Sequence, residues 1–287
     1  MSIKRKYFIH IGPPKTATTS LQDFFFKKKF RSLTYEGIIQ PREKYDNSLC
    51  SVIYKISASE KHLKSYDFES LINKKLNSHI SFLSEEMFLV ESKGMSWKEK
   101  VSRLHKITSS IEPTIVIVLR EPISAIRSYY QELYYSVDRS KIKTIDDFAK
   151  SEYCDIYMYE KLISYLKNIG FNKLKILEFE KLINGNYTVG EIFNIDDNER
   201  VILSNNNISK KKGKIHQTNN AIDKSAISKF IPEIIKNNVN KKYKNKIMNI
   251  LLSLNIGKGK KIDIKIDSEI ENIFIKSYEY VLSSNLT

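Results

Sequence analysis

The residues best suited to chemistry lie near the N-terminus, where a lysine is followed by a run of small hydroxyl side chains. Lys15 supplies a full positive charge, and the threonines and serine after it can donate hydrogen bonds. The amphipathic run Leu21–Phe25 comes next, so the hydroxyl run is expected at a helix start, where free N–H groups and the helix dipole attract anions. The pattern predicts a phosphate-type cradle, with ordinary capping by threonine and serine as the alternative. Its residues are Pro14, Lys15, Thr16, Ala17, Thr18, Thr19 and Ser20.

The stretch in front of Lys15 predicts the strand that positions this cradle. Residues 7–11 are mainly apolar, β-branched or aromatic, as in a buried parallel strand. Gly12-Pro13-Pro14 then ends the strand, because neither proline can donate to a ladder. A nucleotide-binding P-loop, G-x-x-x-x-G-K-[ST], fits poorly, since Lys15 follows Gly12 too closely and no second glycine precedes it.

A second candidate anion site follows the most strongly β-like run of the chain, Thr114–Leu119. A P-loop enzyme would need an acidic residue on such a strand to hold magnesium, whereas this strand ends in Arg120, which favours a metal-free site. Pro122 opens the next helix, and Ser128 lies off its apolar stripe, so Arg120 and Ser128 can converge on one oxyanion. The planar guanidinium binds phosphate oxygens in pairs. A purely structural Arg120 would instead need a buried carboxylate partner.

Both stretches resemble motifs of one known family. Ile9–Gln22 is similar to the 5′-phosphosulfate loop of sulfotransferases that use 3′-phosphoadenosine 5′-phosphosulfate (PAPS), with Ala17 where that family usually has glycine. Val118–Tyr130 resembles the family's 3′-phosphate motif, most closely its form in carbohydrate sulfotransferases of the heparan sulfate type. A weaker resemblance to bacterial members extends the similarity over most of residues 6–216.

The resemblance implies an α/β, P-loop-like three-layer fold in which helices flank a central parallel sheet. It assigns residues 1–216 to a sulfotransferase α/β domain. The helical pattern of residues 217–287 predicts a C-terminal helical layer packed on the same domain.

The resemblance also implies a role for each candidate residue, with PAPS as the sulfuryl donor and no metal ion. Lys15 would neutralise the bridging oxygen as 3′-phosphoadenosine 5′-phosphate (PAP) leaves, and residues 16–20 with the loop amides would hold the 5′-phosphate. Arg120 and Ser128 would hold the 3′-phosphate. A basic loop that closes over the adenosine phosphate in the family corresponds here to Lys212, Gly213 and Lys214, with an exposed basic turn as the alternative.

An acceptor hydroxyl needs a general base. Residues 84–86 follow a short predicted strand, and parallel sheets gather ligands at the carboxyl ends of their strands, so these residues are expected to face the crevice beside Lys15. Glu85 is therefore the first candidate, although it could instead cap the following turn. Glu43 is the second, because related carbohydrate enzymes carry a base after the first helix, and His62 is the third.

Composition restricts the partners and the compartment. The 287 residues carry a formal net charge of +15, which fits an anionic donor and an acidic glycan acceptor, and no nucleic-acid-binding motif is present. No segment approaches the roughly 20 apolar residues that cross a bilayer. Cys50 and Cys154 lack metal-ligand spacing, and the N-terminus leaves no room for a signal peptide, so a reduced cytoplasmic chain is expected.

The sequence therefore predicts a PAPS-dependent sulfotransferase acting by metal-free in-line transfer on a hydroxyl or amine of a small-molecule or glycan acceptor, with a carbohydrate favoured. One alternative is a P-loop-like small-molecule kinase, which would require magnesium and ATP. The other is a non-catalytic protein that binds a polyanion or glycan with steep salt dependence.

Overall fold

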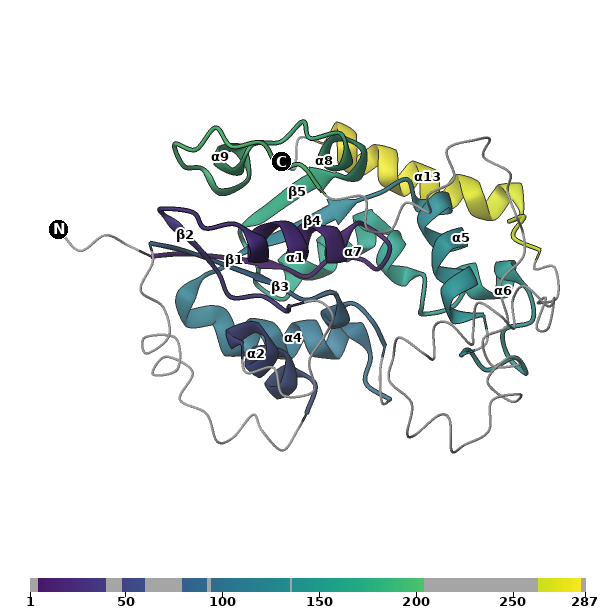
Figure 1. The fold of residues 1–287 in the computed structure, drawn as a ribbon. Helices are drawn as coiled ribbons and strands as arrows, with labels where there is room; N and C mark the ends of the chain where they lie inside the picture. The colour runs from purple at the N-terminus through teal and green to yellow at the C-terminus, as the bar shows by residue number, and fades with distance from the viewer. Residues whose placement is uncertain are drawn as a thin grey trace, which may run out of the picture.

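The computed structural model describes residues 5–39, 48–59, 79–91, 94–134, 136–203 and 263–284. These residues contain a five-stranded sheet in which all neighbouring strands are parallel (Figure 1). The strand order is β2-β3-β1-β4-β5. The strands are β1 (Lys6–His10), β2 (Leu33–Tyr35), β3 (Ile80–Ser84), β4 (Thr114–Leu119) and β5 (Leu174–Glu178). The expected α/β fold with a central parallel sheet is confirmed.

Helices lie on both faces of this sheet (Figure 1). The helices of eight or more residues are α1 (Thr18–Lys27), α2 (Leu49–Ser57), α4 (Trp97–Thr108), α5 (Pro122–Leu133), α7 (Tyr159–Asn168) and α13 (Ser268–Ser283). The shorter ones are α6 (Ile145–Ala149), α8 (Phe179–Ile183), α9 (Val189–Phe193) and the 3₁₀ turns η2 (Glu86–Phe88), η3 (Ser109–Ile111) and η4 (Asp155–Tyr157).

The central strand β4 shows why such an apolar run forms a buried strand. Ile115, Ile117 and Leu119 belong to one apolar core, and Val116 and Val118 belong to the other, because successive side chains of a strand point to opposite faces. The first core includes residues of α2, α4, α5, α7 and α13, and the second includes residues of α1, α8 and α9. A parallel strand covered on both faces reads as a continuous apolar run.

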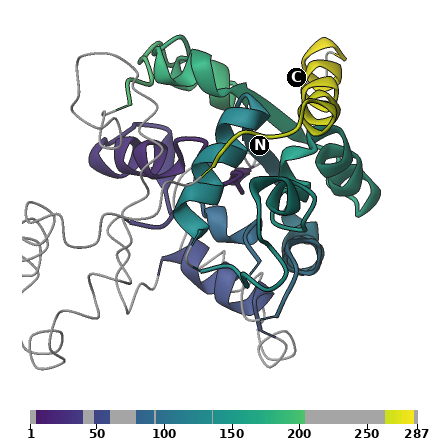
Figure 2. The same ribbon diagram turned by 90° about the vertical axis from the view of Figure 1, so that its right-hand side faces the viewer.

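The C-terminal helix α13 packs against α7 and α5 (Figure 2). It contributes Ile270, Phe274 and Val281 to the first core, and the carboxylate of Glu271 forms an ion pair with Arg127 of α5 at 2.5 Å. Residues 204–262, which include the expected boundary at residue 216, lie outside the described ranges, so the division into domain and helical layer stays a prediction. Within the described ranges, every helix is too short or too polar to span a bilayer.

The direction of the strands fixes where a site can form. Because all strands are parallel, their carboxyl ends meet at one edge of the sheet, which is where α/β proteins bind ligands. At this edge β1 leads into the loop before α1, β3 leads into η2, β4 leads into α5 and β5 leads into α8.

Candidate active site

A cleft of about 1180 Å³ opens at the carboxyl ends of the strands. Its lining comes from the segments that follow β1, β3, β4 and β5. The two expected anion contacts, Lys15 and Arg120, both line this one cleft, as does Ser128 of α5. The other predicted residues in its lining are Pro14, Ala17, Thr18, Thr19 and Ser20.

The loop between β1 and α1 has an unusual backbone. Lys15 and Ala17 both have positive φ angles, 67° and 62°, a region that costs a non-glycine residue of the order of 1–3 kcal/mol. The position at which the resembling family usually has glycine is therefore one at which glycine would fit without strain. Gly12 also has a positive φ, and a Cβ atom there would lie 2.8 Å from the Thr18 hydroxyl, so the loop requires glycine at that point.

The N-terminus of α1 is open toward the cleft. Ala17 is the N-cap residue, and no side chain caps the helix, so the expected alternative of ordinary threonine or serine capping does not apply. The first amides of a helix have no acceptor within the helix. The hydroxyl of Thr18, which is only 2% exposed, has no hydrogen-bond partner among the described residues. Unsatisfied donors of this kind suit an anion.

Thr16 behaves differently from the other hydroxyl residues of the loop. Its side chain is fully buried and donates to the Pro13 carbonyl at 2.7 Å, and it is not part of the cleft lining. The hydroxyl of Thr16 therefore stabilises the loop, and its contribution to a bound anion would have to come from the backbone.

Lys15 already has an anionic contact. Its ammonium Nζ lies 2.7 Å from Oε2 of Glu132, and the two side chains are 31% and 55% exposed. Glu132 stands on α5, one helical turn after Ser128, and both line the cleft. The sequence reasoning missed Glu132, although the spacing of four residues from Ser128 places both side chains on one face of the helix.

The guanidinium of Arg120 is held without a carboxylate partner in the described part of the chain. Nη1 donates to the carbonyl of Lys15 at 2.9 Å, Nη2 donates to the Ser124 hydroxyl at 3.1 Å, and the group lies 4.6 Å from the centre of the Phe179 ring. The neighbouring carboxylate of Glu121 instead accepts from the amides of Ile123 and Ser124. The positive charge of Arg120 is thus available to an anion in the cleft.

Two buried tyrosines, close together in the sequence, form hydrogen bonds to the backbone at both expected anion contacts. The hydroxyl of Tyr157 donates to the Pro14 carbonyl at 2.9 Å, and the hydroxyl of Tyr159 donates to the Arg120 carbonyl at 2.8 Å. Both tyrosines are fully buried, at the junction of η4 and α7. The loops that carry Lys15 and Arg120 are therefore fixed relative to each other.

Glu85, the first candidate for the general base, does not line the cleft. Glu85 is fully buried, Oε1 accepts from the amide of Met87 at 2.9 Å, and the residue is not part of the cleft lining. Capping of the following turn, the alternative role considered for Glu85, is what the geometry shows. Glu86 is the neighbouring carboxylate that lines the cleft. The remaining predicted residues lie outside the described ranges: Glu43, His62, Lys212, Gly213 and Lys214.

Ser84, expected to face the crevice, instead belongs to a buried polar network beneath the loop. Its hydroxyl lies 2.8 Å from Nδ1 of His10, and its carbonyl accepts from Nε2 of Gln22 at 3.1 Å. Burial lowers the pKa of His10 from 6.5 to about 3, so the imidazole is neutral near pH 7. A Cβ atom on Gly12 would lie 3.1 Å from Nε2 of His10, which places the imidazole directly under the loop.

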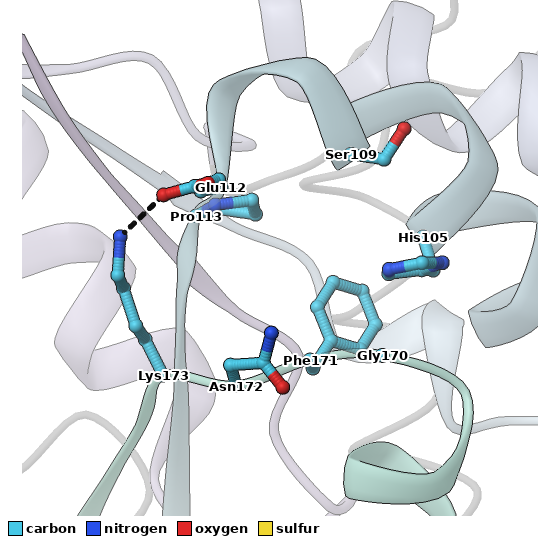
Figure 3. Close-up of a pocket in the computed structure, with 8 residues that line it drawn as sticks. All are labelled: His105, Ser109, Glu112, Pro113, Gly170, Phe171, Asn172 and Lys173. Carbon is cyan, nitrogen blue, oxygen red and sulfur yellow. Dashed lines mark hydrogen bonds and ion pairs between the residues drawn. The ribbon is translucent and has the colours of Figure 1, made fainter.

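A second, smaller cavity of about 250 Å³ lies at the opposite, amino end of β4 and β5 (Figure 3). The rings of His105 and Phe171 are nearly perpendicular, with their centres 4.9 Å apart, and Lys173 forms an ion pair with Glu112 at 2.9 Å across the rim. The amino end of a parallel sheet is not where α/β proteins collect ligands. Anywhere in the described ranges, the structure forms no cluster of three or more histidine, cysteine or acidic side chains able to hold a metal ion.

Comparisons with known proteins give distant likenesses only. No protein-family model matches the sequence, and no curated protein matches it. Among solved structures, a sulfotransferase from Alicyclobacillus acidocaldarius is similar at 10% identity with a TM-score of 0.44, over 98% of this chain and 97% of that one. Mouse sulfotransferase SULT7A1 complexed with PAP is similar at 10% identity with a TM-score of 0.35, over 68% of this chain and 60% of that one. Likenesses this distant identify neither a family nor a reaction, and the cleft itself carries the functional argument.

Proposed function

We propose that the protein is a sulfotransferase that moves the sulfuryl group of PAPS to a hydroxyl or amine of an acceptor. The observation that carries this proposal is that Lys15 and Arg120 line one cleft and are joined by a hydrogen bond from the guanidinium to the Lys15 carbonyl. Two adjacent cationic groups suit a ligand with phosphate at both ends of a nucleoside. PAPS is such a ligand, and its 3′-phosphate distinguishes it from ATP.

The residues of the cleft fit this donor. The uncapped start of α1 and the buried hydroxyl of Thr18 would accommodate the 5′-phosphate, since both offer donors without a partner among the described residues. The guanidinium of Arg120 and the hydroxyl of Ser128 would hold the 3′-phosphate, because the guanidinium fork is suited to paired phosphate oxygens.

Lys15 would contribute most directly to the chemistry. In sulfuryl transfer the attacking and leaving oxygens lie roughly in line and negative charge grows on the leaving oxygen, so positioning and positive charge matter more than covalent catalysis. The Lys15 ammonium would neutralise this charge. A carbohydrate remains our proposed acceptor, on the basis of the sequence resemblance alone, and metal-free transfer is proposed because a cationic side chain follows β4 where a P-loop enzyme would carry an acidic residue.

A thermal-shift comparison of PAP, ATP with magnesium, and heparin tests this proposal. A ligand present at 100 times its Kd stabilises the folded state by about 2.7 kcal/mol, which should raise the Tm of a chain of this length by about 4–5 °C. We expect this shift with PAP and a smaller one with ATP and magnesium. A larger shift with ATP and magnesium would instead indicate a kinase. A shift with heparin alone, lost as salt is raised, would indicate a polyanion-binding protein.

A further inference from the structure

The proposed transfer needs a group that takes the proton of the acceptor, and the cleft offers one that the sequence did not suggest. Of the described residues that line the cleft, the carboxylates are those of Glu86 and Glu132. We propose that Glu132 is the general base, and that donor binding releases it from Lys15. This inference rests on the proposed function, because it assigns Lys15 to the leaving oxygen of the donor.

The position of Glu132 is the first argument. Its Oε2 lies 2.7 Å from Nζ of Lys15, so a carboxylate stands one hydrogen bond away from the ammonium assigned to the leaving oxygen. The helix that carries it is firmly placed, since Ile123, Ile126 and Tyr130 of α5 are buried in the first core. A base must lie within hydrogen-bond reach of the reacting centre, and a rigid helix can hold it there.

The exposure of the ion pair is the second argument. With side chains 31% and 55% exposed, Lys15 and Glu132 form a partly solvated pair that contributes little to stability and is readily exchanged. An anionic donor oxygen offers Lys15 a charge-assisted hydrogen bond of the stronger kind. The donor therefore competes successfully for Lys15, and the carboxylate of Glu132 is left beside the reaction centre without its cation.

The other titratable groups near the loop are less suited to the task. Burial raises the pKa of the Tyr129 phenol, which lines the cleft, so this group stays protonated near neutral pH and does not serve as the base. Glu85 is fully buried with Oε1 on the Met87 amide, and His10 is fully buried beneath the loop. Glu86, on η2, is the other carboxylate in the cleft lining and therefore the remaining candidate for the general base.

With Glu132 as the base, every bond formed and broken in the sulfuryl transfer is accounted for. The acceptor oxygen forms its bond to sulfur while its proton passes to the Glu132 carboxylate. The bond between sulfur and the bridging oxygen breaks, and its electron pair leaves on the 5′-phosphate, where Lys15 neutralises the charge. Because Glu132 is freed only when the donor occupies Lys15, the donor binds before a productive acceptor.

The test uses the full chain and compares Glu132→Gln with Glu86→Gln and with Glu112→Gln. Glu112 is the matched control, because it forms an exposed ion pair with Lys173 at the opposite end of the sheet. Calorimetric titration with PAP should show Glu132→Gln binding up to about fivefold more tightly than the wild type, since Lys15 no longer has a competing partner. Glu112→Gln should bind PAP as the wild type does.

Single-turnover hydrolysis of ³⁵S-labelled PAPS, with water as the acceptor, supplies the second measurement. We expect Glu132→Gln to slow the reaction about 100-fold or more. The variant should also lose the acid limb of the pH–rate profile, which in the wild type reports protonation of the base. Glu86→Gln should slow hydrolysis much less.

Several outcomes would overturn this inference. It fails if Glu132→Gln does not slow hydrolysis, whatever its effect on PAP binding. It also fails if Glu86→Gln is the variant that slows hydrolysis, or if the wild type hydrolyses PAPS no faster than buffer does. A wild type that binds PAP while Glu132→Gln behaves identically rejects the inference and leaves the proposed function standing. A wild type that does not bind PAP rejects the proposed function itself.

Discussion

Replacement of Arg120 by alanine tests the assignment of the 3′-phosphate. A charged hydrogen bond to phosphate contributes about 1.5–3 kcal/mol, so Arg120→Ala should weaken PAP binding by about 10- to 150-fold. The same substitution should change the affinity for adenosine 5′-monophosphate little, because that ligand lacks the 3′-phosphate. The quantity to measure is therefore the ratio of the two dissociation constants, obtained by calorimetric titration.

The structure shows why a ratio is needed. Arg120 also donates to the Lys15 carbonyl at 2.9 Å and to the Ser124 hydroxyl at 3.1 Å, so its loss could disturb the loop that carries Lys15. A disturbed loop would weaken both ligands together and leave the ratio unchanged. A lost contact to the 3′-phosphate would weaken PAP alone.

Two further variants refine this experiment. Arg120→Lys keeps the charge but loses the planar fork, so its affinity for PAP should fall between those of the wild type and Arg120→Ala. Ser124→Ala removes one partner of the guanidinium and keeps the guanidinium itself, and it should retain most of the PAP affinity. If Arg120→Ala weakens PAP and adenosine 5′-monophosphate by the same factor, the 3′-phosphate assignment is wrong.

Three other changes have defined outcomes. Lys15→Ala should lower the rate of sulfuryl transfer by about 100-fold or more in a PAPS turnover assay, because the charge on the leaving oxygen is no longer neutralised, and an unchanged rate would remove Lys15 from the mechanism. Ala17→Gly should raise the free energy of unfolding in urea by up to about 1 kcal/mol, because φ is 62° at this position, and a lower value would contradict the strain argument. His10 binds a proton in the unfolded state near pKa 6.5 and in the folded state only near 3, so stability should fall by about 1.4 kcal/mol for each unit as the pH drops below 6.5. His10→Asn should lack that part of the slope in urea titrations at a series of pH values, and an unchanged slope would assign the acid sensitivity to other groups.

The main elements of the fold follow from local sequence patterns. The apolar runs of β1 and β4, the prolines that end β1 and Pro122 at the start of α5 each act within a few residues, so their effects could be predicted. The prediction that Lys15 and Arg120 lie at one edge of the sheet also rests on a simple rule, because parallel strands bring their carboxyl ends together.

The rest of the candidate site depends on contacts between distant parts of the chain. In the sequence, Glu132 looks like a solvated residue of an amphipathic helix. Its proposed role depends on its ion pair with Lys15, which lies 117 residues away in the sequence. Ser84 was expected to face the crevice but is drawn into the core by His10 and Gln22. Glu85 directly follows β3, where its carboxylate caps the next turn by accepting from the Met87 amide. The spacing of apolar residues in the sequence does not reveal this contact.

The two phenols at the junction of η4 and α7 hold the backbone on both sides of the cleft at a fixed spacing. The Tyr157 hydroxyl donates to the Pro14 carbonyl and the Tyr159 hydroxyl donates to the Arg120 carbonyl, and both tyrosines are fully buried. The spacing between the backbone segments that carry Lys15 and Arg120 is therefore set before any ligand binds. Under the proposed assignment of the two phosphate groups, an isomer that separates them differently, such as a 2′,5′-bisphosphate, should bind more weakly than PAP. To reach both contacts it would have to shift a carbonyl away from its tyrosine and leave a buried hydroxyl without an acceptor.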